Sequence, residues 1–218
     1  MNLESRIAYI KALSESTLEG VFNPWRDVCQ LDLFGKDSPV QRAERLLSHI
    51  SIEKPLLIAC GEAPGYQGCR YSGIPFTSEA LLMKNAIPRV SIHQQPRLTS
   101  RRLPWKEPSA TIVWSTLYNL DIAERVILSN AFPFHPYKPG LNHSNRTPTP
   151  TELTAGGPFL QQLINIFPNT PLVAIGNSAQ TVIQSLGINP DVKVRHPANG
   201  GATKFKEELN YFVQNLTS

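Results

Sequence analysis

The sequence PLLIAC at residues 55–60 is apolar throughout, and GEAPG at residues 61–65 follows it directly. A short apolar run that ends at turn-forming residues is typical of a strand buried on both faces of a sheet. Similar runs occur at residues 110–114, 126–129, 171–175 and 192–195. We interpret each run as a candidate strand, and residues 61–65 as the loop that leaves the first one.

Segments with helical spacing of apolar residues separate these runs, at residues 38–50, 78–86, 159–167, 178–186 and 205–216. Strands that alternate with helices favour parallel βα units. The expected fold class is therefore α/β, a three-layer α/β/α sandwich with a central, mostly parallel four-stranded sheet. We expect residues 1–218 to form a single domain, on which residues 1–54 pack as a helical N-terminal extension.

Three polar loops that follow predicted strands begin at Gly61, Asn130 and His196. Ligands of open parallel sheets bind beyond the carboxyl ends of the strands, so we expect these loops to converge on one site. Residues 131–151 are rich in Pro, Asn, His and Thr and are interpreted as a long loop. Residues 87–110 combine prolines with basic residues, and we interpret them as an irregular surface excursion.

The composition favours a folded globular protein, because 41 % of residues are hydrophobic and only 17 % are charged. A net charge of +4 permits a polyanionic partner but does not establish one. The three cysteines form no CxxC pair, which argues against a disulfide framework and a four-cysteine metal site. We see no signal peptide and no apolar run of the roughly 18–20 residues that a membrane span needs. We expect a cytoplasmic monomer with no membrane segment.

The order and spacing of three segments resemble those of the uracil-DNA glycosylase superfamily. The segments are GEAPG (61–65) with SGIPF (72–76), SN (129–130) with NRTPTP (145–150), and HPANGG (196–201). The similarity is greatest to the thermostable, iron–sulfur branch, whose first motif begins GEAPG. This resemblance implies a monofunctional enzyme of base excision repair. Such an enzyme flips uracil out of DNA and hydrolyses its N-glycosidic bond, giving free uracil and an abasic site.

The resemblance assigns the catalytic roles to His196 and Glu62. As the N-glycosidic bond breaks, negative charge develops on uracil O2. A hydrogen-bond donor that His196 places there stabilises the transition state. Glu62 either orients the attacking water or braces its loop by accepting backbone N–H bonds, and both interpretations stay open. Glu79 is a weaker second carboxylate, for which the alternative is a place in the first turn of a helix.

Base binding falls to Phe76 and Asn130 by the same resemblance. An aromatic ring at Phe76 recovers stacking on the extruded base, whose flipping costs a few kcal/mol. The amide of Asn130 matches O4 and N3–H of uracil, whereas cytosine presents the opposite pattern. The structural alternatives are a core phenylalanine and a turn-capping asparagine. The first motif completes the expected pocket with Gly61, Ala63 and Gly65.

We expect the DNA backbone to lie along the third motif and the basic residues that flank it. One further contact is expected from the second motif. The predicted contacts are Arg195, Ala198, Asn199, Gly200, Lys204 and Arg146. Arg146 has bracing of its loop as an alternative role. Because Gly200 cannot fill the vacated stack, either Asn199 intrudes or the enzyme prefers uracil in single strands or mispairs.

Two features of the related enzymes are missing from this chain. Two positions of the iron–sulfur ligands fall on Phe134 and Gly156, so we predict apolar packing there, no cluster, no metal and no cofactor. The water-positioning aspartate of the best-known members matches Ala63, and the tyrosine that excludes thymine matches Gly65. The missing aspartate favours an alternative, a non-catalytic or crosslinking sensor of uracil-containing or abasic DNA. A nucleotide-binding protein that uses residues 61–65 for phosphate is a third interpretation.

Overall fold

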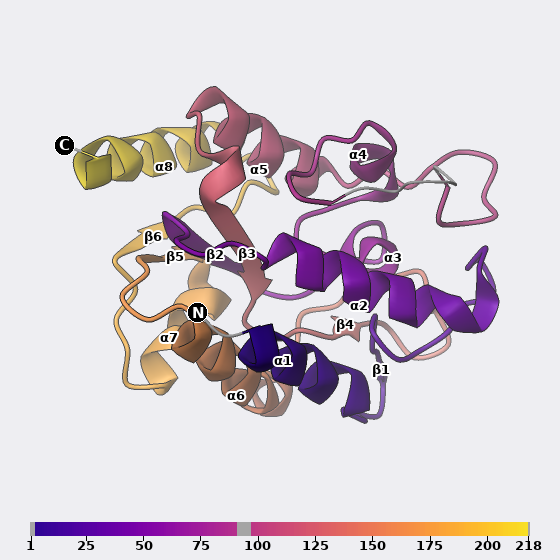
Figure 1. Ribbon diagram of the computed structural model, residues 1–218. Helices are drawn as coiled ribbons and strands as arrows, with labels where there is room; N and C mark the ends of the chain where they lie inside the picture. The colour runs from indigo at the N-terminus through magenta and orange to yellow at the C-terminus, as the bar shows by residue number, and fades with distance from the viewer. Residues whose placement is uncertain (1–2, 91–96, 218) are drawn as a thin grey trace.

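The central sheet of the computed structural model, which describes residues 3–90 and 97–217, has four strands in the order β3-β2-β5-β6. All neighbouring pairs are parallel. Figure 1 shows the strands passing through the middle of the molecule between helices. The strands are β2 (Leu57–Gly61), β3 (Val126–Asn130), β5 (Leu172–Ile175) and β6 (Val192–Val194). The four-stranded parallel sheet expected from the sequence is confirmed.

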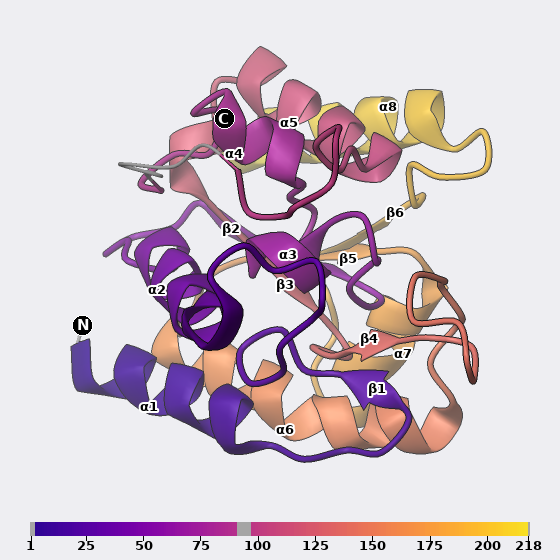
Figure 2. The same ribbon diagram turned by 90° about the vertical axis from the view of Figure 1, so that its right-hand side faces the viewer.

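Helices cover both faces of this sheet. Figure 2 shows α4, α5 and α8 on one side of the strands and α1, α6 and α7 on the other, with α2 beside α1. The expected three-layer α/β/α sandwich is therefore confirmed. The helix bounds are α1 (Leu3–Glu15), α2 (Ser38–His49), α3 (Cys69–Ser72), α4 (Glu79–Met83), α5 (Pro108–Asn119), α6 (Pro150–Ile166), α7 (Asn177–Ser185) and α8 (Ala202–Thr217).

Two apolar layers, one on each face of the sheet, hold the helices in place. Successive side chains of a strand point to opposite faces. Accordingly, Ile58 and Cys60 of β2 belong to the core under α1, α6 and α7, whereas Leu57 and Ala59 belong to the core under α5 and α8. Because both faces are covered, every residue of β2, β3 and β5 is buried. This explains why these strands are apolar runs rather than alternating patterns.

The strand predicted at residues 110–114 is wrong, because these residues lie within helix α5. Pro108 stands at the first helical turn, where proline is favoured. The buried residues of the helix include Ala110, Val113, Trp114 and Leu117, spaced as one helical face. The β-branched run from Thr111 to Val113 resembles a strand, but burial follows the helical period.

The N-terminal segment and the long loop also contain more structure than predicted. Residues 1–54 provide α1 and α2, and also strand β1 (Val21–Phe22), which pairs antiparallel with β4 (His135–Pro136) in the 131–151 loop. Helix α6 begins at Pro150, well before the predicted start at Phe159, and Thr149 and Glu152 form a capping box there. Two short 3₁₀ helices occupy Gly35–Asp37 and Ala123–Arg125.

Glu79 fixes the position of the predicted surface excursion, whose residues 91–96 lie outside the described ones. Its buried carboxylate accepts hydrogen bonds from the backbone N–H groups of Leu98, Thr99 and Trp105, at 2.8, 3.0 and 3.0 Å. It also accepts from Thr99 Oγ1 at 2.8 Å and pairs with Arg97 Nε at 2.9 Å. Glu79 begins helix α4, as its structural alternative required.

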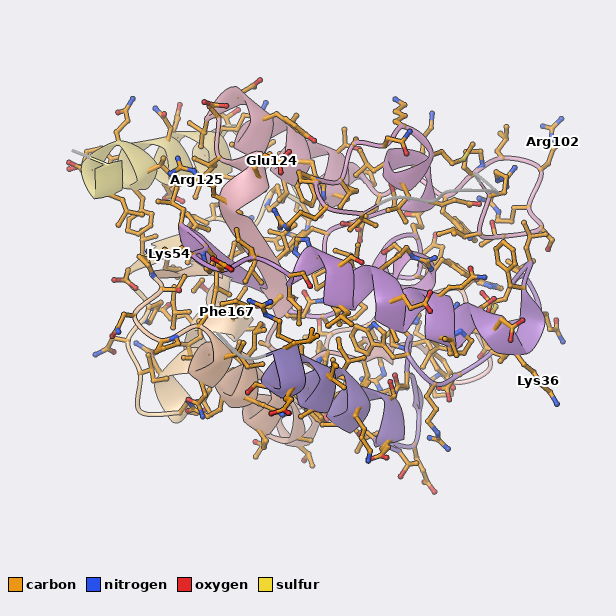
Figure 3. The ribbon with its side chains drawn as sticks, viewed as in Figure 1. Lys36, Lys54, Arg102, Glu124, Arg125 and Phe167 are labelled. Atoms are coloured by element: carbon orange, nitrogen blue, oxygen red, sulfur yellow. The ribbon has the colours of Figure 1, made fainter. Side chains whose placement is uncertain are left out.

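The two ends of the sheet differ in character. Lys54, Arg125 and Phe167 precede β2, β3 and β5 and mark the amino end, along the left side of Figure 3. The opposite, carboxyl end carries the loops that begin at Gly61, Asn130 and His196. Gly61 and Asn130 are partners in the register of β2 and β3, so these two loops leave the sheet side by side.

Candidate functional site

A cavity of about 220 Å³ opens at the carboxyl end of the sheet. The three loops that were expected to converge all contribute to it. Residues of the 131–151 loop and of the excursion close its remaining sides. The lining consists of Glu62, Ala63, Pro64, Gly65, Phe76, Glu107, Ser109, Asn130, Asn145, Arg146, His196 and Ala198.

Phe76 forms one wall of this cavity and packs against the end of β2. The residue is buried and adopts φ +50°, a left-handed conformation that costs a non-glycine residue energy. Its ring takes the place of a side chain at Gly61: a Cβ there would overlap the ring and lie 3.0 Å from Asn130 Oδ1. Glycine at position 61 therefore lets the ring of Phe76 and the amide of Asn130 meet at one point.

Asn130 ends strand β3 and is only 8 % exposed. Its backbone is held in the ladder with β2, and Ala131 N continues the ladder by donating to Gly61 O at 2.8 Å. Its side-chain amide lines the cavity and has no hydrogen-bond partner within the described residues. Its donor and its acceptor are therefore both available to a ligand in the cavity.

His196 follows strand β6 and lines the cavity, and one hydrogen bond defines the tautomer of its ring. Ala198 N donates to His196 Nδ1 at 3.1 Å, so the proton of the neutral ring is on Nε2. Burial lowers the pKa of His196, with Glu62 opposing and Arg195 reinforcing that effect. The imidazole is therefore neutral at pH 7 and offers an Nε2–H donor. Its ring centroid lies 6.0 Å from that of Phe76.

Glu62 sits between the cavity and the surface, where Ser178 Oγ donates to its Oε2 at 2.5 Å. The brace on this carboxylate is thus a side-chain hydroxyl from α7, and not the backbone N–H groups proposed as one alternative. Its Oε1 has no hydrogen-bond partner in the part of the chain that the structure describes. One oxygen of Glu62 is fixed and the other is free to accept from a ligand or water.

Ala63 and Gly65 line the cavity mainly through their backbone, and Gly65 faces a residue that the sequence did not single out. The Glu107 carboxyl lies against Gly65, where a Cβ would come within 2.6 Å of Glu107 Oε1. Asn145 of the second motif also lines the cavity, and its Oδ1 accepts from Tyr66 N at 2.9 Å. Glu107 belongs to the excursion, which has no motif, so nothing in the sequence pointed to it.

A second, more polar cavity of about 570 Å³ adjoins the first and shares Glu62, His196 and Ala198 with it. Its lining includes three basic residues, Lys193, Arg195 and Lys204. The sequence did not single out Lys193 as a site residue, because residues 192–195 indicate only a strand. Its Nζ donates to Asn177 Oδ1 at 3.0 Å at the start of α7.

The predicted DNA-binding loop forms the rim of the second cavity. Asn199 and Gly200 are exposed at its tip, with left-handed φ values of +53° and +76°. Gly201 is required below the tip, because a Cβ there would overlap His196 O. No atom lies within 4 Å of a Cβ built on Gly200. The tip therefore projects into open space next to the cavity.

Arg146 is engaged within its own loop. It forms two hydrogen bonds to the Glu152 carboxylate, at 2.7 and 2.6 Å, and its Nε donates to Tyr137 O at 3.0 Å. Glu152 is itself a member of the capping box of α6. This arrangement favours the bracing alternative for Arg146, which reaches the cavity as part of its wall.

Of the two positions that match iron–sulfur ligands, Phe134 is packed against apolar rings and Gly156 against backbone. Phe134 is 1 % exposed, and its ring makes edge contacts with Trp25, Phe132 and Phe159. A Cβ at Gly156 would overlap Ala131 O. All three cysteines are buried and free. Within residues 3–90 and 97–217, no three His, Cys, Asp or Glu side chains come together as a metal site.

A parallel α/β/α sandwich with a small polar cavity beyond its strand ends defines a class of ligand-binding α/β proteins. The sequence pattern of one family in this class, the Uracil DNA glycosylase superfamily, matches residues 48–217. The chain belongs to that superfamily, as its motifs indicated. Its place in the GEAPG branch stays a prediction.

One solved structure to which the chain is similar is that of wild-type SMUG2 from Pedobacter heparinus. The TM-score is 0.68 and the sequence identity is 12 %, over 100 % of this chain and 99 % of that one. At this identity the similarity shows the fold alone. A search of curated proteins finds no match. Among the described helices, none has the length and apolar character needed to cross a membrane.

Proposed function

We propose that this protein is a monofunctional DNA glycosylase that hydrolyses the N-glycosidic bond of uracil in DNA. One arrangement carries the proposal: the unpartnered amide of Asn130, the ring of Phe76 and the imidazole of His196 line the same cavity. These groups suit three different parts of one flat base. The amide matches an edge, the ring matches a face, and the imidazole matches an oxygen that gains charge.

Base recognition rests on Asn130 and Phe76. In the bound state the amide donates to uracil O4 and accepts from N3–H, a pattern that cytosine reverses. The Phe76 ring replaces the stacking that the base loses on leaving the duplex. Because both side chains are held at the end of the sheet, little ordering is needed on binding.

Leaving-group stabilisation rests on His196. As the C1′–N1 bond breaks, both of its electrons go to the base, and negative charge develops on O2. The neutral imidazole donates its Nε2–H to that oxygen, an interaction that strengthens as the charge grows. Ala198 N–H fixes the tautomer, so the donor is in place before the reaction begins.

Activation of the attacking water rests on Glu62. The oxygen of a water molecule bonds to C1′ while Glu62 Oε1 accepts one of its hydrogens and then takes that proton. Ser178 holds the other carboxylate oxygen and so limits rotation of the side chain. No lysine is among the described residues that line the cavity, so none of them is a Schiff-base nucleophile, and we expect no cleavage of the abasic strand.

The second cavity is the proposed path of the DNA backbone. Lys193, Arg195 and Lys204 bring positive charge beside the base cavity, where phosphates flanking an extruded nucleotide would lie. The backbone of Ala198 to Gly200 approaches from the rim. Since Gly200 offers no wedge, we propose that uracil in single strands or mispairs is cleaved faster than uracil paired with adenine.

The test is release of uracil from a labelled oligonucleotide under single-turnover conditions. Purified protein should release the base, and His196→Ala should slow the release about 10²–10³-fold, the usual cost of losing one such donor. Exposed Lys36, which lines neither cavity, provides the control variant Lys36→Ala.

The same experiment separates the proposal from the binding-only alternative, which the alanine at position 63 favours. Tight binding of uracil-containing DNA with no release of base would support the sensor. An unchanged rate in His196→Ala would remove the imidazole from the mechanism.

A further inference from the structure

A carboxyl group without a partner stands in the wall of the base cavity. Glu107 lines this cavity, yet its Oε2 is shielded from solvent and has no hydrogen-bond partner among the described residues. The residue is also the N-cap of α5, but its side chain does not cap the helix. The carboxyl group is therefore not used by the helix that it precedes, and it remains beside the cavity.

The surrounding chain is shaped to admit this group. A Cβ at Gly68 would overlap Glu107 Oε2, just as a Cβ at Gly65 would crowd Oε1. Gly65 of the first motif and Gly68, three residues further on, thus leave the volume that the carboxyl occupies. From the other side, Glu79 anchors Trp105 N at 3.0 Å, two residues before Glu107. The carboxyl is placed by fixed backbone on both sides.

The electrostatic surroundings favour the neutral form of the group. Burial raises the pKa of Glu107 to about 7. The titratable and charged groups that face it are Glu62, Arg146 and His196 across the cavity and the Cys69 thiol of α3. Arg146 is already paired with Glu152, and burial keeps His196 neutral. No unpaired cation among these residues therefore holds Glu107 in its ionised form.

We propose that Glu107 is a further catalytic residue, which contacts the extruded base and donates a hydrogen bond to it as the glycosidic bond breaks. This inference rests on the proposed glycosylase function. The departing base becomes an anion in a partly enclosed cavity, where a second negative charge would raise the barrier and a neutral carboxylic acid would lower it. The proton stays on Glu107, so the step needs no additional reactant. His196 and Glu107 thus form two neutral donors to one leaving group.

The test is the pH profile of single-turnover uracil release, from pH 5.5 to 9, for wild type, Glu107→Gln and Glu107→Ala. The wild-type rate should fall as pH rises through about 7, because Glu107 ionises. Glu107→Gln keeps a neutral donor of the same shape, so its rate should stay level above pH 7 and exceed the wild-type rate at pH 8.5. Glu107→Ala should be slower than Glu107→Gln by at least tenfold at every pH.

The outcomes are distinguishable from failure of the proposed function. If wild-type protein releases no uracil at any pH, the glycosylase assignment fails. If it releases uracil but Glu107→Gln follows the wild-type pH profile, the assignment stands and the role of Glu107 is refuted. Thermal unfolding of each variant identifies any loss that comes from misfolding. Because Gln matches Glu in shape, it keeps the test informative even if Glu107→Ala does not fold.

Discussion

Replacing Glu107 by glutamine should stabilise the protein, and only at neutral and alkaline pH. Burial raises the pKa of this carboxyl from 4.5 to about 7. At 1.36 kcal/mol per pH unit, the folded state thus loses at most about 3 kcal/mol when the group must ionise. Below pH 4.5 the carboxyl is neutral in both folded and unfolded chains and costs nothing. Between pH 4.5 and 7 the unfolded chain ionises first, so stability falls, and above pH 7 the loss is constant.

Thermal unfolding at pH 5 and pH 8 measures this effect. For a chain of this size, each kcal/mol corresponds to about 2–4 °C in Tm. Glu107→Gln should therefore raise Tm by several degrees at pH 8 and by much less at pH 5. The control is Glu19→Gln, which removes the same charge from an exposed position and should change Tm little at either pH.

A result that contradicts this reasoning is an equal change in Tm at both pH values, or a lower Tm at pH 8. Either would mean that the carboxylate is solvated or paired in the folded protein. A gain in stability that accompanies altered catalysis is the usual signature of a binding-site residue, because such residues are kept for their chemistry at some cost in stability.

Three further predictions concern other parts of the molecule. Phe134→Ala should lower the free energy of unfolding, measured in urea, by about 3–5 kcal/mol, because it leaves a cavity where a fully buried ring packs. Asn130→Asp removes the donor to uracil O4, so uracil release by the folded variant should fall at least about 10²-fold. Arg195→Ala and Lys204→Ala should each reduce the slope of log K for DNA against log salt by about one, measured by fluorescence anisotropy, whereas Lys36→Ala should not.

The sequence was sufficient for the sheet and for the loops that end it. Apolar runs such as residues 55–60 have few alternatives when turn residues bound them, so β2, β3, β5 and β6 were predicted. The exception was residues 110–114, where β-branched residues obscured a helical face. Trp114 and Leu117 decide the period, but the run at residues 110–114 does not include Leu117.

The candidate site was predictable only where a motif marks it. Asn130 ends β3 and His196 lies two residues after β6, and parallel topology alone brings such positions to one edge. Glu107 has no such signal, since its approach depends on glycines about 40 residues earlier and on the anchor at Glu79. Contacts of this long range come from packing, which local patterns do not encode. The tautomer of His196 likewise follows from one backbone N–H that the sequence does not reveal.

The anchoring of residues 97–105 by Glu79 has an evolutionary consequence. This segment leads to one wall of the cavity, and it is held by the Glu79 carboxylate and by backbone hydrogen bonds to residues 31–33, not by the register of the sheet. Substitutions between that anchor and α5 can thus alter which molecules fit, while the strands that carry Asn130 and His196 remain unchanged. New specificity can therefore arise by substitution in this peripheral segment, without any change in the sheet.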